Sequence, residues 1–230
     1  MSTLTSPVMM FAAGFGTRMK HLTQDQPKPL IPVAGKPLIG HALDLARAGG
    51  GDPIVANLHY KADMLDAYLK PLGVQTITER PDILETGGGL RNALPLIGPG
   101  PVITMNTDAI WVGPNPIELL RAVWDPDVMD ALLVCVPTAS ALGYEGTGDF
   151  LVSETGRMER GSGAVFGGIQ MMKTDLLQTI PDSKFSLNLV WNKMLQTGRL
   201  FGLTYPGKWC DVGHPGGISI AENMLERNGV

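Results

Sequence analysis

The sequence lacks a long apolar run and contains only two cysteines. Its apolar stretches, such as Ala131–Val136, are far shorter than the ~18 residues that a membrane-spanning helix requires. Cys135 and Cys210 lie far apart among apolar or aromatic residues, which predicts two buried thiols rather than a disulfide or a metal pair. The first seven residues contain no Lys or Arg, so we expect no secretory signal peptide. These absences predict a cytoplasmic globular protein.

Charged residues are also scarce. They make up 17% of the chain, below the ~25% that is usual in globular proteins. Lys and Arg total 18 and Asp and Glu total 22, for a net charge of −4. This balance argues against a nucleic-acid binder but leaves room for a local cationic pocket. No linker, repeat or low-complexity segment divides the chain, so we expect one domain over residues 1–230, and the sequence indicates no oligomeric state.

Short apolar runs alternate with helical patterns along the chain. The expected strands span residues 8–12, 53–58, 74–78, 101–105, 129–136, 164–172 and 200–205. The expected helices include residues 38–45, 64–69, 88–94 and 187–196, one helix capped by Asn115, and a last helix from Pro215. This alternation predicts an α/β fold with a mixed, mostly parallel central sheet flanked by helices.

The polar, glycine-rich segment 138–163 breaks this alternation. We expect the irregular second half of the chain to supply a small accessory sheet and a lid, with 138–163 as the lid region. In open sheets of this kind, ligands bind beyond the carboxyl ends of the strands. Candidate functional residues are therefore expected just after each strand.

The loop after the first expected strand is small and rich in glycine. It reads Ala12-Ala13-Gly14-Phe15-Gly16-Thr17-Arg18. Its small residues would let backbone N–H groups approach phosphate oxygens. Met19 occupies the place of the third glycine in a dinucleotide-binding fingerprint, and Gly35-Lys36-Pro37 does not fit a P-loop. By itself the loop is weak support for a phosphate site.

A rigidly mounted lysine follows this loop. Pro27 and Pro29 restrict the backbone on both sides of Lys28. Together with the glycine loop and Arg18, this mounting favours a functional cation over a solvated surface lysine.

These residues form an ordered set along the chain. It consists of Gly14-x-Gly16-Thr17-Arg18, Pro27-Lys28-Pro29-Leu30 and Gly35-Lys36-Pro37-Leu38. The set resembles the motif of the nucleotidyltransferases that make nucleoside-diphosphate sugars. The resemblance implies a Rossmann-like GT-A domain that transfers a nucleoside monophosphate from a nucleoside triphosphate to a sugar 1-phosphate and releases pyrophosphate. His21 stands where the family usually has proline, which we expect to alter loop stiffness rather than chemistry.

Two aspartates are candidates for a metal site. Transfer at an α-phosphorus needs a divalent cation, and Mg²⁺ is typically held by one or two carboxylates with phosphate oxygens and water. Asp108 and Asp211 each follow an expected strand, but their separation leaves open whether they meet. Asn106-x-Asp108 and the segment around Asp211 resemble the family's two metal motifs, although Thr107 replaces the commoner glycine. The structural alternatives are a turn or cap for Asp108 and a cap of the last helix for Asp211.

A second glycine-rich segment, Glu85-Thr86-Gly87-Gly88-Gly89, sits where the family places its nucleobase and phosphate contacts. Three glycines at a helix start would expose N–H donors, unless they form a helix entrance that binds no ligand. The segment resembles that of short bacterial uridylyltransferases that use UTP and act on N-acetylmuramic acid 1-phosphate in peptidoglycan recycling.

The same resemblance implies that Asn106 and Asp149 contact the sugar phosphate. The alternative for Asp149 is a loop residue that bonds its own backbone. His59 is expected to be structural, and Trp111 and Trp209 either line a pocket or pack in the core.

The expected chemistry is an in-line displacement. The sugar phosphate is already anionic, so the attack needs no general base. Loop amides from Ala13 to Gly16 would hold the triphosphate, Arg18 the leaving pyrophosphate, and Lys28 the α-phosphate with the incoming oxygen. The expected partners are thus a nucleoside triphosphate and a sugar 1-phosphate, with no nucleic acid and no membrane.

Three alternatives stay open. The first is another member of this reaction class, such as a mannose-1-phosphate guanylyltransferase or a cytidylyltransferase that acts on a phospho-alcohol. The second is a non-catalytic nucleotide-binding module, which the presence of both Asp108 and Asp211 disfavours. The third is an interaction protein, which the lack of repeats or an apolar stripe disfavours.

Overall fold

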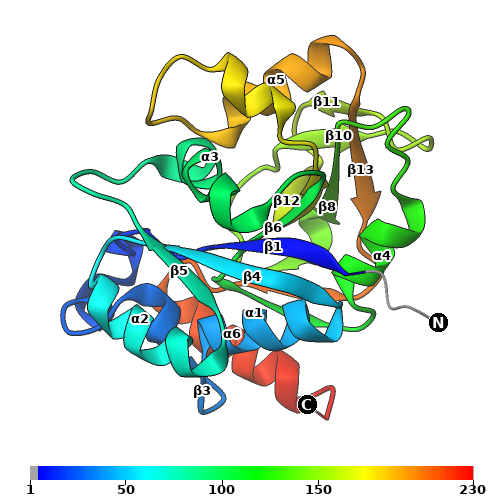
Figure 1. Ribbon diagram of the computed structural model, residues 1–230. Helices are drawn as coiled ribbons and strands as arrows, with labels where there is room; N and C mark the ends of the chain where they lie inside the picture. The colour runs from blue at the N-terminus through cyan, green and yellow to red at the C-terminus, as the bar shows by residue number, and fades with distance from the viewer. Residues whose placement is uncertain (1–4, 230) are drawn as a thin grey trace.

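The computed structural model describes residues 5–229 and shows a twisted central sheet with helices on both faces (Figure 1). The strands are β1 (Ser6–Phe11), β2 (Pro32–Val33), β3 (Lys36–Pro37), β4 (Gly51–Leu58), β5 (Gln75–Thr78), β6 (Val102–Asn106), β7 (Ala109–Val112), β8 (Ala131–Pro137), β9 (Ala141–Leu142), β10 (Phe150–Val152), β11 (Met158–Arg160), β12 (Ala164–Met172), β13 (Leu200–Thr204) and β14 (Lys208–Asp211). The helices are α1 (Leu38–Ala48), α2 (Ala62–Leu69), α3 (Glu85–Ile97), α4 (Pro116–Val123), α5 (Leu187–Gln196) and α6 (Pro215–Glu226).

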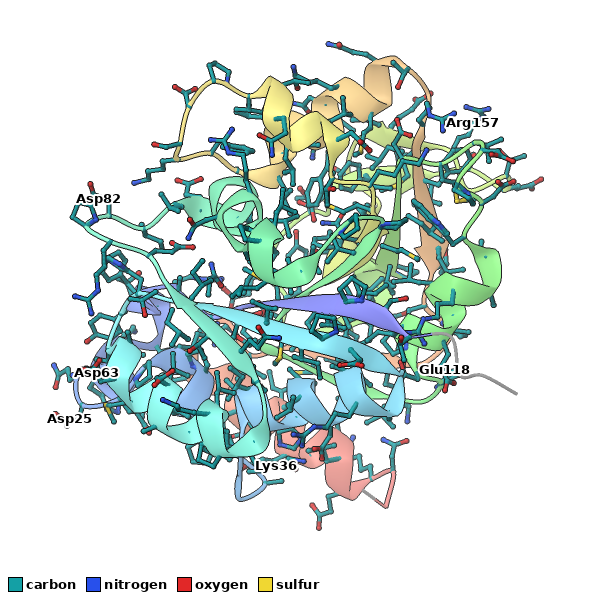
Figure 2. All side chains as sticks on the ribbon, viewed as in Figure 1. Asp25, Lys36, Asp63, Asp82, Glu118 and Arg157 are labelled. Atoms are coloured by element: carbon teal, nitrogen blue, oxygen red, sulfur yellow. The ribbon has the colours of Figure 1, made fainter. Side chains whose placement is uncertain are left out.

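The central sheet is mixed. Within the described range, nine strands form it, in the order β11-β10-β12-β6-β1-β4-β5, with β8 beside β12 and β13 beside β8. β1 pairs in parallel with β4 and β6, and β4 with β5, whereas β12 runs antiparallel to β6 and β8. The parallel part brings the carboxyl ends of four strands to one edge, where a ligand site is expected. Charged side chains such as Asp25, Lys36 and Arg157 lie at the periphery (Figure 2).

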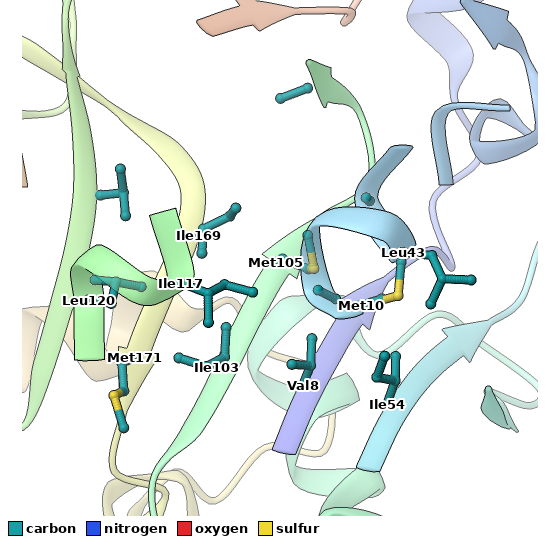
Figure 3. Packing of buried hydrophobic residues seen from close by; sticks show 14 of the residues in the cluster. Val8, Met10, Leu43, Ile54, Ile103, Met105, Ile117, Leu120, Ile169 and Met171 are labelled. Atoms are coloured by element: carbon teal, nitrogen blue, oxygen red, sulfur yellow. The ribbon is translucent and has the colours of Figure 1, made fainter. Parts of the chain in front are cut away.

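Strand β1 explains why both faces of the sheet carry helices. Its Val8 and Met10 lie in an apolar cluster with α1, α2 and α4, whereas Met9 lies in a second cluster with α3 and α5. Successive side chains of a strand point to opposite faces, so a strand that is apolar throughout must be covered on both. Figure 3 shows the first cluster, in which Leu43 of α1 and Ile117 of α4 pack over the sheet.

A smaller sheet of β7, β14 and β9 lies beside the central one. A third apolar cluster, which includes Cys210 of β14 and Ala221 and Leu225 of α6, packs the last helix against it. The accessory sheet was expected from the second half of the chain, which supplies β9 and β14, whereas β7 comes from the first half. Strands β7 and β14 are four residues long and lie far apart in the sequence, so their pairing is non-local.

The helix starts follow the sequence signals. The Oδ1 atom of Asn115 accepts a hydrogen bond from the backbone N–H of Ile117 at 2.9 Å, which caps α4 as predicted. Helix α6 begins at Pro215, also as predicted, but its N-cap residue is His214. Asp211 therefore does not cap this helix, and its structural alternative fails.

Both cysteines are free and buried, as predicted. Burial raises the pKa of Cys135 and of Cys210 to about 12, and the nearby charges of Asp149 and Asp211, respectively, add to the rise. None of the helices that the structure describes is long and apolar enough to span a membrane.

We expect both thiols to resist modification in the native protein at mildly alkaline pH. Thiol reagents attack an accessible thiolate, and burial removes both the access and the charge. A colorimetric thiol titration should detect no rapidly reacting group in buffer and two after unfolding in guanidinium chloride. Release of one rapid equivalent from the folded protein would contradict the burial of these side chains.

Candidate active site

The carboxyl ends of β1, β4 and β6 open onto a cavity of about 320 Å³, a size that suits a small ligand. Most of the residues that the sequence predicted line it. They are Ala12, Ala13, Gly14, Gly16, Thr17, Arg18, Lys28, Glu85, Thr86, Asn106 and Asp108. We call this space the first cavity.

The glycine loop is held against Lys28. Gly16 has a φ of 64°, and a Cβ atom added there would stand 2.7 Å from the Cβ of Lys28. Only glycine fits, because of both the left-handed backbone and the close approach. The Thr23 hydroxyl donates to the carbonyl oxygen of Gly16 at 3.3 Å, and the Tyr60 hydroxyl donates to that of Thr23 at 2.8 Å. These contacts fix the loop to the 3₁₀ helix η1 (Thr17–Thr23) and the end of β4.

Lys28 is buried and points into the first cavity. It begins the short 3₁₀ helix η2 (Lys28–Leu30), between Pro27 and Pro29, and is 8% exposed. Its Nζ donates to Oδ2 of Asp108 at 2.8 Å. A buried ammonium group is costly without a partner, so this ion pair fixes the direction of the lysine.

Asp108 and Asp211 meet because two short strands pair. Strand β14 runs antiparallel to β7 with Asp211 opposite Ala109, and the N–H of Val212 donates to the carbonyl oxygen of Asp108 at 2.9 Å. Both aspartates line a second cavity of about 390 Å³, which adjoins the first at Asp108. The structure thus brings together two aspartates that the sequence indicated only as separate candidates for a metal site.

The two carboxylates lie close enough to influence each other. Burial and the negative charge of Asp108 raise the pKa of Asp211, while Lys28, Arg18 and His214 lower it. Within residues 5–229, no cluster of three or more His, Cys, Asp or Glu side chains offers an all-protein metal cage. Two neighbouring carboxylates fit a hard divalent cation that takes its other ligands from phosphate and water.

Arg18 is the second cation at these carboxylates. It lines both the first and the second cavity. A Cβ atom on Gly213 would stand 2.9 Å from Nη1 of Arg18 and 2.6 Å from Oδ2 of Asp211, so glycine at this position leaves room for both groups. Arg18 and Lys28 together can neutralise a phosphate chain in the first cavity.

The second glycine segment differs in part from the expectation. Glu85 and Thr86 line the first cavity at the start of α3. The N–H groups of Gly87 and Gly88, however, donate to the carbonyl oxygen of Phe185 at 2.9 and 3.0 Å. A Cβ atom on Gly87 would stand 2.3 Å from the Phe185 ring. These two glycines let the segment before α5 pack on α3, and their N–H groups are not left exposed for a phosphate.

Asn106 lines the first two cavities and also a third, of about 230 Å³. The third cavity contains Asp149, whose Oδ2 accepts a hydrogen bond from the N–H of Phe166 at 2.9 Å. This bond joins the start of β10 to β12 rather than closing a turn on its own backbone. Asn188 and Trp191 of α5 also line the third cavity.

Two residues that the sequence motifs did not indicate, Asn57 and Glu79, connect the loop after β1 to the start of α3 at the first cavity. Oδ1 of Asn57 accepts from the N–H of Ala12 at 2.9 Å, and its Nδ2 donates to Oε1 of Glu79 at 2.7 Å. Oε2 of Glu79 accepts from the N–H of Leu84 at 2.7 Å, just before α3. Asn57 lies near the end of an expected strand, and Glu79 comes directly after the next one. Their positions at the carboxyl ends of strands were the one feature of the sequence that could have indicated them as site residues.

The aromatic residues left open by the sequence make packing contacts. Nδ1 of His59 lies 3.0 Å from the carbonyl oxygen of Glu79. Nε1 of Trp209 donates to the carbonyl oxygen of Gly167 at 2.9 Å, and the Trp111 ring meets the Tyr205 ring edge-on, with centroids 4.8 Å apart. Trp209 also lines the second cavity, so it combines both of its expected roles.

Known proteins resemble this chain over most of its length. It is 38% identical to an N-acetylmuramate alpha-1-phosphate uridylyltransferase of Caulobacter vibrioides, over 98% of this chain and 99% of that protein. A Neisseria meningitidis serogroup B protein of the same description is 30% identical, over 89% and 92%. A probable mannose-1-phosphate guanylyltransferase 2 of Arabidopsis thaliana is 26% identical, over 90% of this chain and 61% of that protein.

Solved structures share the fold. The crystal structure of HddC from Yersinia pseudotuberculosis complexed with GMP-PN has a TM-score of 0.77 at 23% identity, over 96% of this chain and 99% of that chain. The family model of the MobA-like NTP transferase domain matches residues 8–145, which contain the glycine loop, Lys28 and Asp108. The chain therefore belongs to the family of MobA-like NTP transferase domains and is a nucleotidyltransferase.

Proposed function

We propose that the protein transfers uridylate from UTP to N-acetylmuramic acid 1-phosphate, gives UDP-N-acetylmuramic acid and pyrophosphate, and serves peptidoglycan recycling. The observation that carries the proposal is the convergence of Lys28, Asp108 and Asp211 where the first two cavities adjoin. The two uridylyltransferases that resemble this chain over most of its length support the choice of substrates. Residues 1–230 would act as one nucleotidyltransferase domain.

The nucleotide is proposed to occupy the first cavity. Its triphosphate would lie on the loop from Ala12 to Thr17, where backbone N–H groups and Arg18 supply donors. Its base would lie near Glu85 and Thr86 at the start of α3. Gly87 and Gly88 would shape this wall rather than bind, because Phe185 takes their N–H groups.

The sugar 1-phosphate is proposed to span the junction and the third cavity. Asn106 lines all three cavities, so it can contact the sugar phosphate wherever the two substrates meet. In the third cavity, Asp149 would accept a hydrogen bond from a sugar hydroxyl through its Oδ1 atom. The N–H of Phe166 binds the other oxygen, Oδ2.

The reaction is an in-line displacement at the α-phosphorus. A sugar phosphate oxygen forms the new bond, and the bond from the α-phosphorus to the bridging oxygen breaks, which releases pyrophosphate. The ammonium of Lys28 has three donors and uses one on Asp108, so it can also contact the α-phosphate and the incoming oxygen. Arg18 stabilises the charge that develops on the leaving group. Catalysis is thus positioning and charge neutralisation.

Asp108 and Asp211 are proposed to hold a divalent cation, with Mg²⁺ the ion that this donor set suits. When bound, such an ion neutralises charge on the phosphoryl oxygens. Burial and the repulsion between the two carboxylates raise the pKa of Asp211, and a bound cation would relieve that repulsion.

The substrate assignment is tested by measuring pyrophosphate release from pairs of nucleoside triphosphates and sugar 1-phosphates. UTP with N-acetylmuramic acid 1-phosphate should give the fastest release, and a chelator of divalent cations should abolish it. A preference for GTP with mannose 1-phosphate would instead support the second candidate, for which the match to the Arabidopsis thaliana protein is the supporting observation.

Replacement of Lys28 by alanine should lower kcat by about 10²–10³, because one preorganised cation at the transferring phosphoryl group is lost. Lys36→Ala is the matched control, since Lys36 belongs to the same sequence motif but forms an exposed ion pair with Asp44 (Figure 2). Steady-state kinetics should show Lys36→Ala near the wild type. Activity of Lys28→Ala within tenfold of the wild type would refute the assigned role.

Glu79→Gln should lower kcat/KM for the nucleotide by about tenfold, mainly through KM. Both carboxylate oxygens of Glu79 accept hydrogen bonds, one from Nδ2 of Asn57 and one from the N–H of Leu84. In glutamine an NH₂ group replaces one of these oxygens, so one of the two hydrogen bonds is lost. Glu222→Gln is the control, because Glu222 accepts a single bond from the N–H of Ala34 at an exposed turn. Equal kinetics for the two variants would show that the bridge does not position the nucleotide.

A further inference from the structure

Arg160 lies beside the third cavity, at the end of β11. One nitrogen of its guanidinium, Nη2, donates to Oδ1 of Asn188 at 2.8 Å and to Oδ1 of Asn192 at 2.9 Å. The guanidinium carbon lies 4.5 Å from the centroid of the Phe150 ring and 5.9 Å from that of Trp191. Two amides and two aromatic rings thus hold the planar group in one orientation.

The charge of Arg160 has no direct carboxylate partner within residues 5–229, because no Asp or Glu oxygen there comes within 4.0 Å of it. Its hydrogen-bond partners are neutral amides that use only Nη2, so within the same range Nη1 and Nε have no bonded acceptor. Partial burial lowers the pKa of Arg160, and the charge of Asp149 raises it. An oriented cation that lacks a paired anion is suited to bind one from a ligand.

The guanidinium of Arg160 contacts residues of the cavity in which the sugar is proposed to bind. Asn188 and Trp191, which contact the guanidinium, line the third cavity together with Asp149 and Asn106. Asn106 also lines the cavity at Asp108, where the phosphate of the sugar is proposed to react. A sugar with its phosphate at that junction would extend its far substituents toward Arg160.

We propose that Arg160 determines specificity by binding a carboxylate carried by the sugar, so that the enzyme selects an acidic sugar 1-phosphate over a neutral one. The inference rests on the proposed function. N-acetylmuramic acid carries such a group on its lactyl ether, and N-acetylglucosamine is the same sugar without that ether. Nη1 and Nε lie on different edges of the guanidinium, so either of these free donors can give a single charge-assisted hydrogen bond to an oxygen of the ligand carboxylate, while Nη2 stays with the two amides.

Asp149 keeps Arg160 charged, and its negative charge also repels a ligand carboxylate on its own side of the guanidinium. Its carboxylate is held by the N–H of Phe166 and stabilises the charged form of Arg160. The ligand carboxylate would bind Arg160 at the donors that the protein leaves free. Because this contact is remote from the reacting phosphorus, it should strengthen substrate binding and act on KM more than on kcat.

The test compares three acceptors with UTP as donor: N-acetylmuramic acid 1-phosphate, its lactyl methyl ester, and N-acetylglucosamine 1-phosphate. The methyl ester keeps the size of the acceptor and removes only the charge. In the wild type, kcat/KM for the acid should exceed that for the ester by about 10- to 100-fold. In Arg160→Gln this ratio should fall to near one, with turnover of the ester unchanged.

Arg157→Gln is the matched control. Arg157 precedes the same strand, donates to the carbonyl oxygen of Gly198 and packs over the Phe201 ring, at the periphery of the molecule (Figure 2). Its loss should leave the acid-to-ester ratio as in the wild type. Arg160→Lys keeps the charge without the planar group that the two amides and two rings orient, and it should give an intermediate ratio.

The outcomes separate the two proposals. If the wild type uses N-acetylmuramic acid 1-phosphate and Arg160→Gln keeps the wild-type ratio, the role of Arg160 is refuted while the proposed function stands. If the wild type prefers N-acetylglucosamine 1-phosphate or another neutral sugar phosphate, both are refuted. If Arg160→Gln loses activity on the ester as well as on the acid, its thermal unfolding shows whether the variant is folded, and the acid-to-ester ratio of Arg160→Lys decides. An intermediate ratio in Arg160→Lys supports the role of Arg160, and a wild-type ratio refutes it. An acid-to-ester ratio near one in the wild-type enzyme overturns the inference in any case.

Discussion

A buried ammonium group and a carboxylate, joined at 2.8 Å, hold the centre of this site together. Lys28 can occupy its place because Gly16 has no side chain and because prolines stiffen the backbone on either side. Asp108 is available because β6 ends just before it, at the edge of the sheet where parallel strands end. The buried ammonium group would be costly there without a partner, so the pair couples the glycine loop to the sheet.

The pairing of β7 with β14 adds an unfavourable interaction between two like charges. It sets Asp211 beside Asp108, and burial with the like charge raises the pKa of Asp211. A fold that places two acids together in this way gains from cations, and Lys28 and Arg18 supply two. The chain as a whole is acidic, with a net charge of −4, yet the loop after β1 and the segment of Lys28 concentrate positive charge at one edge of the sheet. Local charge, rather than net charge, decides what the site can bind.

Much of the fold follows from local patterns. Strand β12 and helix α5 have the bounds that the sequence predicted, 164–172 and 187–196, because an apolar pattern is a property of neighbouring residues. The cap at Asn115 and the buried state of both cysteines were predicted for the same reason. The accessory sheet was predicted in kind but not in composition, since short strands far apart in the chain leave little periodic signal.

The sequence by itself determined which residues could act: a small glycine loop, a lysine fixed between prolines, and two aspartates after strands. Only the tertiary structure decided that the aspartates meet, that Phe185 takes the N–H groups of Gly87 and Gly88, and that Asn57 and Glu79 bridge the cavity walls. The physical reason is distance along the chain. Backbone restriction and burial patterns are encoded within a few residues, whereas these contacts depend on the pairing and packing of segments that are neighbours only once the chain has folded.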